Sequence, residues 1–101
     1  MTKDWDFKQR VLEADAEEET CVWAKANGWL PRKVRYVGRK NCVDRHFYGY
    51  GAVVMIEFKK PDDELRIGQA KEHARLIKAG LKPRVCTSKD EAIRVLKEYM
   101  N

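Results

Sequence analysis

Three residues of this sequence have side chains and a spacing suited to phosphate chemistry: Asp44, Glu57 and Lys59. Glu57 and Lys59 follow an unbroken apolar run, Ala52–Ile56, whose β-branched residues predict a strand covered on both faces. Because side chains alternate along a strand, Glu57 and Lys59 point to one face and Phe58 to the other. Charges at the end of a buried strand are costly unless they are paired or bind a ligand. The pattern therefore fits either a functional site or a structural ion pair.

Asp44 lies on the preceding segment, Cys42–Tyr48, which has the composition of a second strand. Gly49–Gly51 separates the two segments and predicts a hairpin turn. We expect this hairpin to place Asp44 beside Ile56 or Glu57. Two carboxylates would then meet at the same end of two adjacent strands.

Two converging carboxylates with one lysine suit a hard divalent cation, which prefers oxygen ligands and keeps several waters. We expect Asp44 and Glu57 to bind Mg²⁺ or Mn²⁺, with the main-chain carbonyl of Phe58 as a third protein ligand. Such a metal polarises a phosphoryl oxygen and lowers the pKa of a bound water. We expect Lys59 to orient that water or to stabilise the negative charge that develops during phosphodiester hydrolysis.

Asp44 with Glu57-Phe58-Lys59 resembles the PD-(D/E)XK nuclease motif, and the wider sequence resembles its VRR-NUC branch. That branch has a helix carrying a Glu, a G-x-P-D-R segment, a strand ending in Glu-x-Lys, and a helix opened by Gln. The corresponding segments here are Glu17-Glu18-Glu19, Val43-Asp44-Arg45, Ile56–Pro61 and Gln69. The resemblance extends from about Glu17 to Tyr99, and Val43 stands where the family usually has proline.

The resemblance implies one nuclease domain over residues 1–101 with an α/β, restriction-endonuclease-like fold. This fold has an αβββαβ core, a C-terminal helix, and a mixed central sheet flanked by helices. It also implies a Mg²⁺- or Mn²⁺-dependent DNA endonuclease. Stand-alone members, of the phage and bacterial type, resemble Holliday-junction-resolving nucleases, so we expect a homodimer acting on branched DNA. The interface candidates are apolar residues of the first helix: Trp5, Phe7, Leu12 and Trp23.

The family pattern adds two further site residues, an acid on the first helix and a glutamine on the second. For the acid we favour Glu17, because it shares a helical stripe with small residues such as Thr20 and Ala24 that would let the helix lie close to the sheet. Glu19 is the second choice, and solvated glutamates with no role are the alternative. Gln69 lies in the first turn of its helix, where its amide can reach the site and the helix dipole favours a phosphate.

The chain is basic, with a net charge of +5 and a pI near 9.2, which favours a polyanionic partner. Positive side chains crowd the stretch before Asp44 and continue after Lys59. We expect the following residues to contact the DNA backbone: Arg32, Lys33, Arg35, Arg39, Lys40, Arg45 and Lys60. The alternative is an exposed edge strand protected by its lysines and arginines.

The remaining pattern predicts the other elements and the cellular setting. The expected elements are a helix over Phe7–Asn27, a strand over Trp29–Val37, a hairpin pairing Tyr48 with Ala52, a helix over Arg66–Ala79, a strand over Arg84–Thr87, and a last helix capped by Ser88 and Glu91. The crossover helix should make the last strand parallel to the Glu57 strand and adjacent to it. Three cysteines without C-x-x-C spacing, no signal peptide and no membrane-spanning run favour a cytoplasmic protein with reduced thiols.

Two non-catalytic alternatives remain open from the sequence. In the first, the protein is a nucleic-acid-binding module in which Asp44, Glu57 and Lys59 are structural. In the second, it is a nuclease-like subunit that only scaffolds a larger assembly. A binder would keep its affinity for DNA in EDTA, whereas a nuclease needs the metal for turnover.

Overall fold

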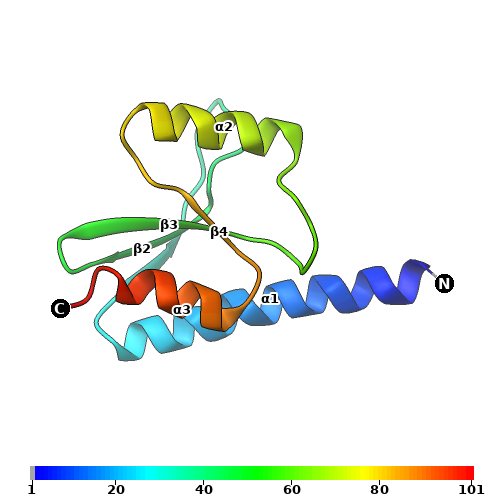
Figure 1. Cartoon of the computed structure of the whole chain (residues 1–101), viewed down its shortest axis with the longest axis horizontal. Coiled ribbons are helices and arrows are strands. Elements are labelled where there is room, and N and C mark those ends of the chain that lie inside the picture. The colour runs from blue at the N-terminus through cyan, green and yellow to red at the C-terminus, as the bar shows by residue number, and fades with distance from the viewer. Residues whose placement is uncertain (1) are drawn as a thin grey trace.

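A four-stranded mixed sheet with helices on both faces forms the protein, as the computed structural model shows (Figure 1). The structure describes the backbone of residues 2–101 and the side chains of residues 13–101. In chain order the elements are α1 (Thr2–Ala26), β1 (Leu30–Lys33), β2 (Arg45–Gly49), β3 (Ala52–Phe58), α2 (Ile67–Lys78), β4 (Arg84–Cys86) and α3 (Lys89–Lys97). This order confirms the predicted αβββαβ core with a C-terminal helix.

The sheet has the order β1-β2-β3-β4. β2 is antiparallel to both of its neighbours, β1 and β3. β4 lies beside β3 and is parallel to it, as the crossover through α2 requires. Helix α2 covers one face of the sheet, and α1 and α3 pack together on the other (Figure 1). The end of β3 therefore lies between two helical layers.

The β2–β3 hairpin sets the position of the predicted acidic pair. Its turn, Tyr50-Gly51, has two positive φ angles, 53° and 73°, the geometry of a tight two-residue hairpin turn. Gly49 pairs with Ala52 and Tyr48 with Val53, so the predicted pairing of Tyr48 with Ala52 is wrong by one position.

The far end of this ladder lies next to the predicted site. The last pair is Arg45 with Ile56, and the next positions along the two chains are Asp44 and Glu57. The prediction that Asp44 lies beside Glu57 is therefore confirmed.

Three predicted boundaries differ from the structure by more than one residue. The segment Cys42–Tyr48, predicted as a strand, is a strand only from Arg45 onward, so Asp44 lies in the loop just before β2. The first helix begins at Thr2 rather than Phe7. The strand predicted over Trp29–Val37 covers only Leu30–Lys33. Residues 34–44 form a loop instead, in which Tyr36 donates a hydrogen bond to Glu72 of α2 rather than pairing within the sheet.

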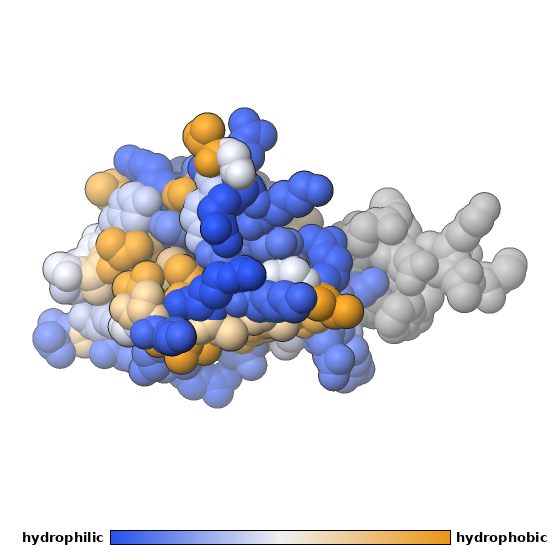
Figure 2. Space-filling model, turned by 90° about the horizontal axis from the view of Figure 1, so that it is seen from above, coloured by the Kyte–Doolittle hydropathy of each residue, from blue (hydrophilic) through white to orange (hydrophobic). Residues whose placement is uncertain are grey.

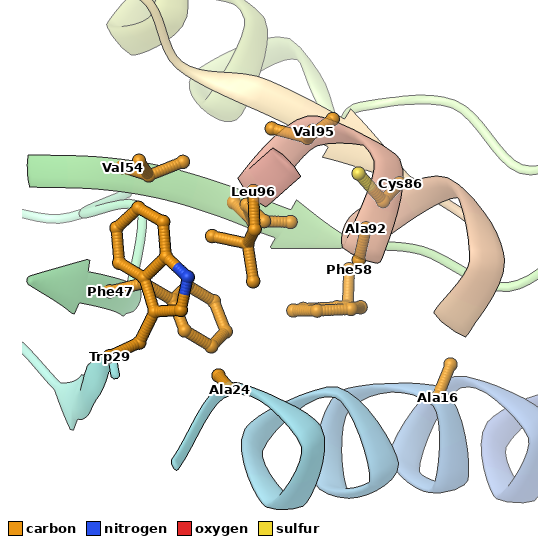
Figure 3. Packing of buried hydrophobic residues seen from close by; sticks show 11 residues of the cluster. Ala16, Ala24, Trp29, Phe47, Val54, Phe58, Cys86, Ala92, Val95 and Leu96 are labelled. Atoms are coloured by element: carbon orange, nitrogen blue, oxygen red, sulfur yellow. The ribbon is translucent and has the colours of Figure 1, made fainter. Parts of the chain in front are cut away.

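The hydrophobic core lies between the sheet and the α1–α3 layer. Ala16 and Ala24 of α1 point toward the sheet (Figure 3), and buried Thr20 lies between them along the helix. These small side chains let α1 approach the sheet closely. The core also contains larger residues from the sheet, from α3 and from the residue before β1: Trp29, Phe47, Val54, Ile56, Phe58, Val95 and Leu96.

The last helix confirms the predicted cap. Ser88 Oγ accepts a hydrogen bond from the Glu91 N–H at 3.1 Å, and the Glu91 carboxylate accepts one from the Thr87 N–H at 2.7 Å. The three cysteines are free thiols. Within the described residues, no helix has the length and hydrophobicity needed to span a membrane.

Candidate active site

A cavity of about 970 Å³ lies at the C-terminal end of β3, between the loop of residues 34–44 and the start of α2. Five of the site residues predicted from the sequence line it: Asp44, Glu57, Phe58, Lys59 and Gln69. They come from the end of the 34–44 loop, from β3, from the residue after β3, and from the first turn of α2. The fold thus brings together residues up to 25 positions apart in the sequence.

Glu57 is the most perturbed acid of this cavity. Its side chain is 12 % exposed, and its Oε1 atom is buried without a hydrogen-bond partner. Burial, and secondly the negative charge of Asp44, raise the pKa of Glu57 to about 7, against the opposing charges of Lys59 and Arg66. A positive ion in the cavity would relieve both of these unfavourable effects.

Lys59 lies directly after β3 and is buried, with 8 % of its surface exposed. Its main-chain N–H donates to the Cys86 carbonyl at 2.9 Å, which continues the pairing with β4 and fixes the backbone there. Among the residues whose side chains are described, none forms a hydrogen bond or ion pair with its ammonium group. A buried lysine that lines a cavity beside an acid is costly for folding and is typical of a functional group.

Asp44 lines the same cavity and is half exposed. Its Oδ2 atom is 3.4 Å from Lys33 Nζ, which also lies 2.9 Å from the Glu17 carboxylate. Lys33 therefore bridges Asp44 to an acid of the first helix. This bridge neutralises part of the charge of Asp44 in the metal-free protein.

Gln69 occupies the third position of α2 and is buried. Its side-chain oxygen accepts a hydrogen bond from the Arg66 N–H at 3.0 Å, so it caps the helix. The cap uses the oxygen and leaves the two amide N–H donors. Gln69 is thus held rigidly at the cavity wall by its structural role.

The structure brings Glu13, rather than Glu17, to this cavity. Glu13 shares the helical face of Ala16, Thr20 and Ala24, which packs on the sheet. Its negative charge also contributes to the raised pKa of Glu57.

Glu17 lies beside that face and points away from the cavity. It accepts hydrogen bonds from Lys33 and Arg45, each at 2.9 Å. Although burial raises the pKa of Glu17, these two hydrogen bonds outweigh it and lower the pKa overall. Sequence reasoning missed Glu13, because Glu13 and Glu17 both share a helical stripe with Thr20 and Ala24.

The predicted DNA-contacting residues divide into two sets. Lys33, Arg35, Arg39 and Lys40 line the cavity, together with Arg66, which the sequence analysis did not select. The others do not line it: Arg45 is held by Glu17, Arg32 donates to the adjacent Pro31 carbonyl, and Lys60 is half-buried after the end of β3. Viewed from the α2 side, much of the surface is hydrophilic (Figure 2).

Contacts with α2 hold the basic loop in place. Tyr36 donates to the buried Glu72 carboxylate at 2.6 Å, and Arg39 lies 3.4 Å from the same group. The hydrogen bond to Glu72 raises the pKa of Tyr36 to about 12. Gly68 lets the loop approach closely, because a Cβ there would lie 2.6 Å from the Asn41 amide. The loop is therefore pre-organised over the cavity.

His46 does not line this cavity, although it lies only two residues after Asp44. Its Nε2 atom lies 2.9 Å from the Val43 carbonyl, so this nitrogen carries the proton and donates it. Its Nδ1 atom is 3.4 Å from the Tyr48 hydroxyl. His46 is thus engaged in packing the hairpin.

The donor set of the cavity fits a hard cation better than a soft one. Among the described residues, no group of three or more His, Cys, Asp and Glu side chains is already arranged as a metal cage. Mg²⁺ needs no such cage, because it binds one or two carboxylates and keeps several waters. Asp44 and Glu57 supply those carboxylates. The ring of Phe58 packs in the core, so Phe58 can contribute only main-chain atoms to the cavity.

The fold is similar to that of a solved structure. A solved structure described as a VRR_NUC domain aligns with a TM-score of 0.77 and 24% sequence identity, covering 87% of this chain and 97% of that chain. No protein-family model matches the sequence, and no curated protein matches it. At this identity the likeness establishes architecture. The chain therefore has the fold of the VRR_NUC domain, the restriction-endonuclease-like fold that its sequence predicted.

Proposed function

We propose that this protein is a Mg²⁺- or Mn²⁺-dependent DNA endonuclease. The observation that carries the proposal is the cavity that Asp44, Glu57 and the buried residue Lys59 line together. The similarity in fold to a VRR_NUC domain supports this proposal, because the name of that domain suggests a nuclease. The raised pKa of Glu57 also supports it, since an acid made unfavourable by burial and by a second acid gains most from a cation.

In this proposal Asp44 and Glu57 hold the cation, with the main chain of Phe58 and the carboxylate of Glu13 beside them. The bound ion would supply positive charge to the phosphodiester and lower the pKa of a water molecule. Lys59 places its ammonium where negative charge develops on the phosphate, in a site with little water to screen it. Gln69 offers its amide N–H groups to a phosphate oxygen or to the attacking water.

The basic loop binds and orients the DNA backbone. Lys33, Arg35, Arg39 and Lys40 lie along one wall of the cavity, and the contacts of Tyr36 with α2 hold that wall in position. Phosphate contacts of this kind position the substrate without reading its sequence. We therefore propose a nuclease selective for the structure of DNA rather than its sequence.

Branched DNA and dimerisation form the finer part of the proposal. Among the described residues, one cavity holds both carboxylates, so cutting opposed strands of a four-way junction would take two copies of it, and a two-fold dimer is the simplest arrangement. Of the interface candidates, Trp5, Phe7 and Leu12 lie outside the residues whose side chains are described. Trp23 packs against the hydrophobic core, with Lys97 Nζ 6.0 Å from its ring centre, so it supports the monomer fold.

The direct test uses purified protein with Mg²⁺, Mn²⁺ or EDTA and linear, flapped, forked and four-way-junction DNA. We expect metal-dependent cleavage, symmetric nicks across the junction, and twice the chain mass by light scattering. Lys59→Ala should lower turnover by about 10²- to 10³-fold with unchanged Mn²⁺ affinity, because its ammonium acts on developing charge. Lys78→Ala, which removes a lysine that does not line the cavity, is the charge-matched control.

The outcomes separate the alternatives. DNA binding in EDTA with no cleavage in either metal would indicate a non-catalytic binding or scaffold protein. A monomer that nicks linear duplex as readily as a junction would refute branched-DNA selectivity and leave the nuclease assignment standing. A lower melting temperature of Lys59→Ala, large enough to explain its lost activity, would instead indicate a structural role for Lys59.

A further inference from the structure

The buried face of α2 is unusual because it is polar. Helices that pack on a sheet normally bury an apolar stripe. The buried residues of α2 are Gln69, Glu72 and His73, and none of them belongs to the hydrophobic core. Gln69 and Glu72 are accounted for by the helix cap and by the contact with Tyr36. His73 has no such partner, although burying an unsatisfied polar group costs about 1–3 kcal/mol.

The unsatisfied atom of His73 faces another unsatisfied atom. His73 Nε2 and Glu57 Oε1 are both buried without a hydrogen-bond partner, and they lie 3.9 Å apart. A movement of about 1 Å would bring them to ordinary hydrogen-bond distance. A neutral imidazole carries one proton, and with that proton on Nε2 His73 can donate to a carboxylate oxygen.

We propose that His73 is a positioning residue for Glu57, donating a hydrogen bond from Nε2 to Oε1 when the carboxylate is charged. Because Oε1 is enclosed against His73, Oε2 is the oxygen that Glu57 presents to the cavity. Hydrogen bonds from outer residues fix the orientation of metal-binding side chains, and their loss typically weakens metal affinity 10- to 100-fold. This inference rests on the proposed metal site. In it, His73 determines which carboxylate oxygen of Glu57 binds the cation.

The test compares Mn²⁺ affinity, measured by calorimetry, in three variants. His73→Leu removes the donor at similar volume, and we expect affinity to fall about tenfold or more. His73→Gln keeps an N–H donor at nearly the same reach and should retain affinity close to that of the wild type. His73→Asn is one methylene shorter, so it should lose affinity as His73→Leu does. Should His73→Leu fail to fold, the comparison of the Gln and Asn variants still decides.

A double-mutant cycle separates positioning from simple packing. In the Glu57→Gln background, His73→Leu should no longer change Mn²⁺ affinity, because the carboxylate that it orients is gone. An equal loss in both backgrounds would overturn the proposal, as would Asn and Gln variants with the same affinity as each other. Wild-type protein that binds no Mn²⁺ would overturn the metal site itself. Tight wild-type binding that His73→Leu leaves unchanged would overturn only the role of His73.

Discussion

Replacing Glu57 with glutamine should make the metal-free protein more stable, by an amount that depends on pH. The folded protein holds the pKa of Glu57 at about 7, above the usual value of 4.5, chiefly because the side chain is buried and secondly because Asp44 is close. A raised folded-state pKa means that the contribution of this carboxyl to stability is complete below pH 4.5 and is lost as the pH rises through 7. Glutamine has the same shape and never ionises.

The size of the effect follows from the two pKa values. Their difference, at 1.36 kcal/mol per pH unit, corresponds to about 3 kcal/mol at pH 8 and to about 1 kcal/mol at pH 5. The side chain of Glu57 is only 12 % exposed, so solvent screening reduces this value little. In a domain of this size, a gain of about 3 kcal/mol raises the melting temperature by more than roughly 10 °C.

The assay is urea unfolding in EDTA, followed by tryptophan fluorescence at several values between pH 5 and pH 8. The matched control is Glu17→Gln. It removes an acid of the first helix whose exposure is similar to that of Glu57 but whose pKa is lowered rather than raised. Because hydrogen bonds from Lys33 and Arg45 outweigh burial and lower the pKa of Glu17, that variant should be less stable at pH 7 by about 1 kcal/mol. Between pH 5 and pH 8 this deficit should stay constant, because the stabilisation by Glu17 is lost only as the pH falls below 4.5. A Glu57→Gln gain that is the same at pH 5 and pH 8, or a loss, would refute the reasoning.

Three further predictions concern the helix acid, the hairpin and the DNA wall. Glu13→Gln should weaken Mn²⁺ binding in calorimetry about tenfold more than Glu17→Gln does, because only Glu13 lines the cavity; equal effects would contradict this placement. Gly49→Ala should lower the free energy of unfolding by about 1–3 kcal/mol in urea titration, since its Cβ would lie 2.9 Å from Trp29 Cε3, and an unchanged value would show that the hairpin relaxes. Lys40→Ala should weaken DNA binding in EDTA and reduce the salt dependence, the slope of log K against log salt, by about 1; an unchanged slope would exclude a phosphate contact.

Local sequence rules predicted the parts of the site that lie within one hairpin. Alternation along a strand places Glu57 and Lys59 on one side of β3, whatever the rest of the chain does. Because a tight turn sets the register, Asp44 then lies opposite Glu57, with an error of only one residue at the turn itself. The cap at Ser88 was equally accessible, because helix caps depend on residues three or four positions apart, whereas Gln69 was selected through the resemblance to the family.

The sequence did not predict where the 34–44 loop begins or which face of the first helix packs on the sheet. The strand predicted over Trp29–Val37 ends at Lys33, and Tyr36 beyond it is held by Glu72 of α2, a contact that no local pattern indicates. Glu13 and Glu17 lie about one turn apart, so either can belong to a buried stripe until the packing of α1 is known. Close approach of Ala16 and Ala24 to the sheet decides for Glu13 (Figure 3).

The sequence by itself determined the element order, the mixed sheet and the convergence of Asp44, Glu57 and Lys59, because strand alternation, turn geometry and crossover handedness are short-range constraints. Only the tertiary structure decided which helical acid lines the cavity and that His73 lies against Glu57. Those contacts join residues whose separation along the chain carries no periodic signal. They arise when α1 and α2 pack on opposite faces of the sheet, and that packing depends on the sum of many side-chain contacts rather than on any local pattern.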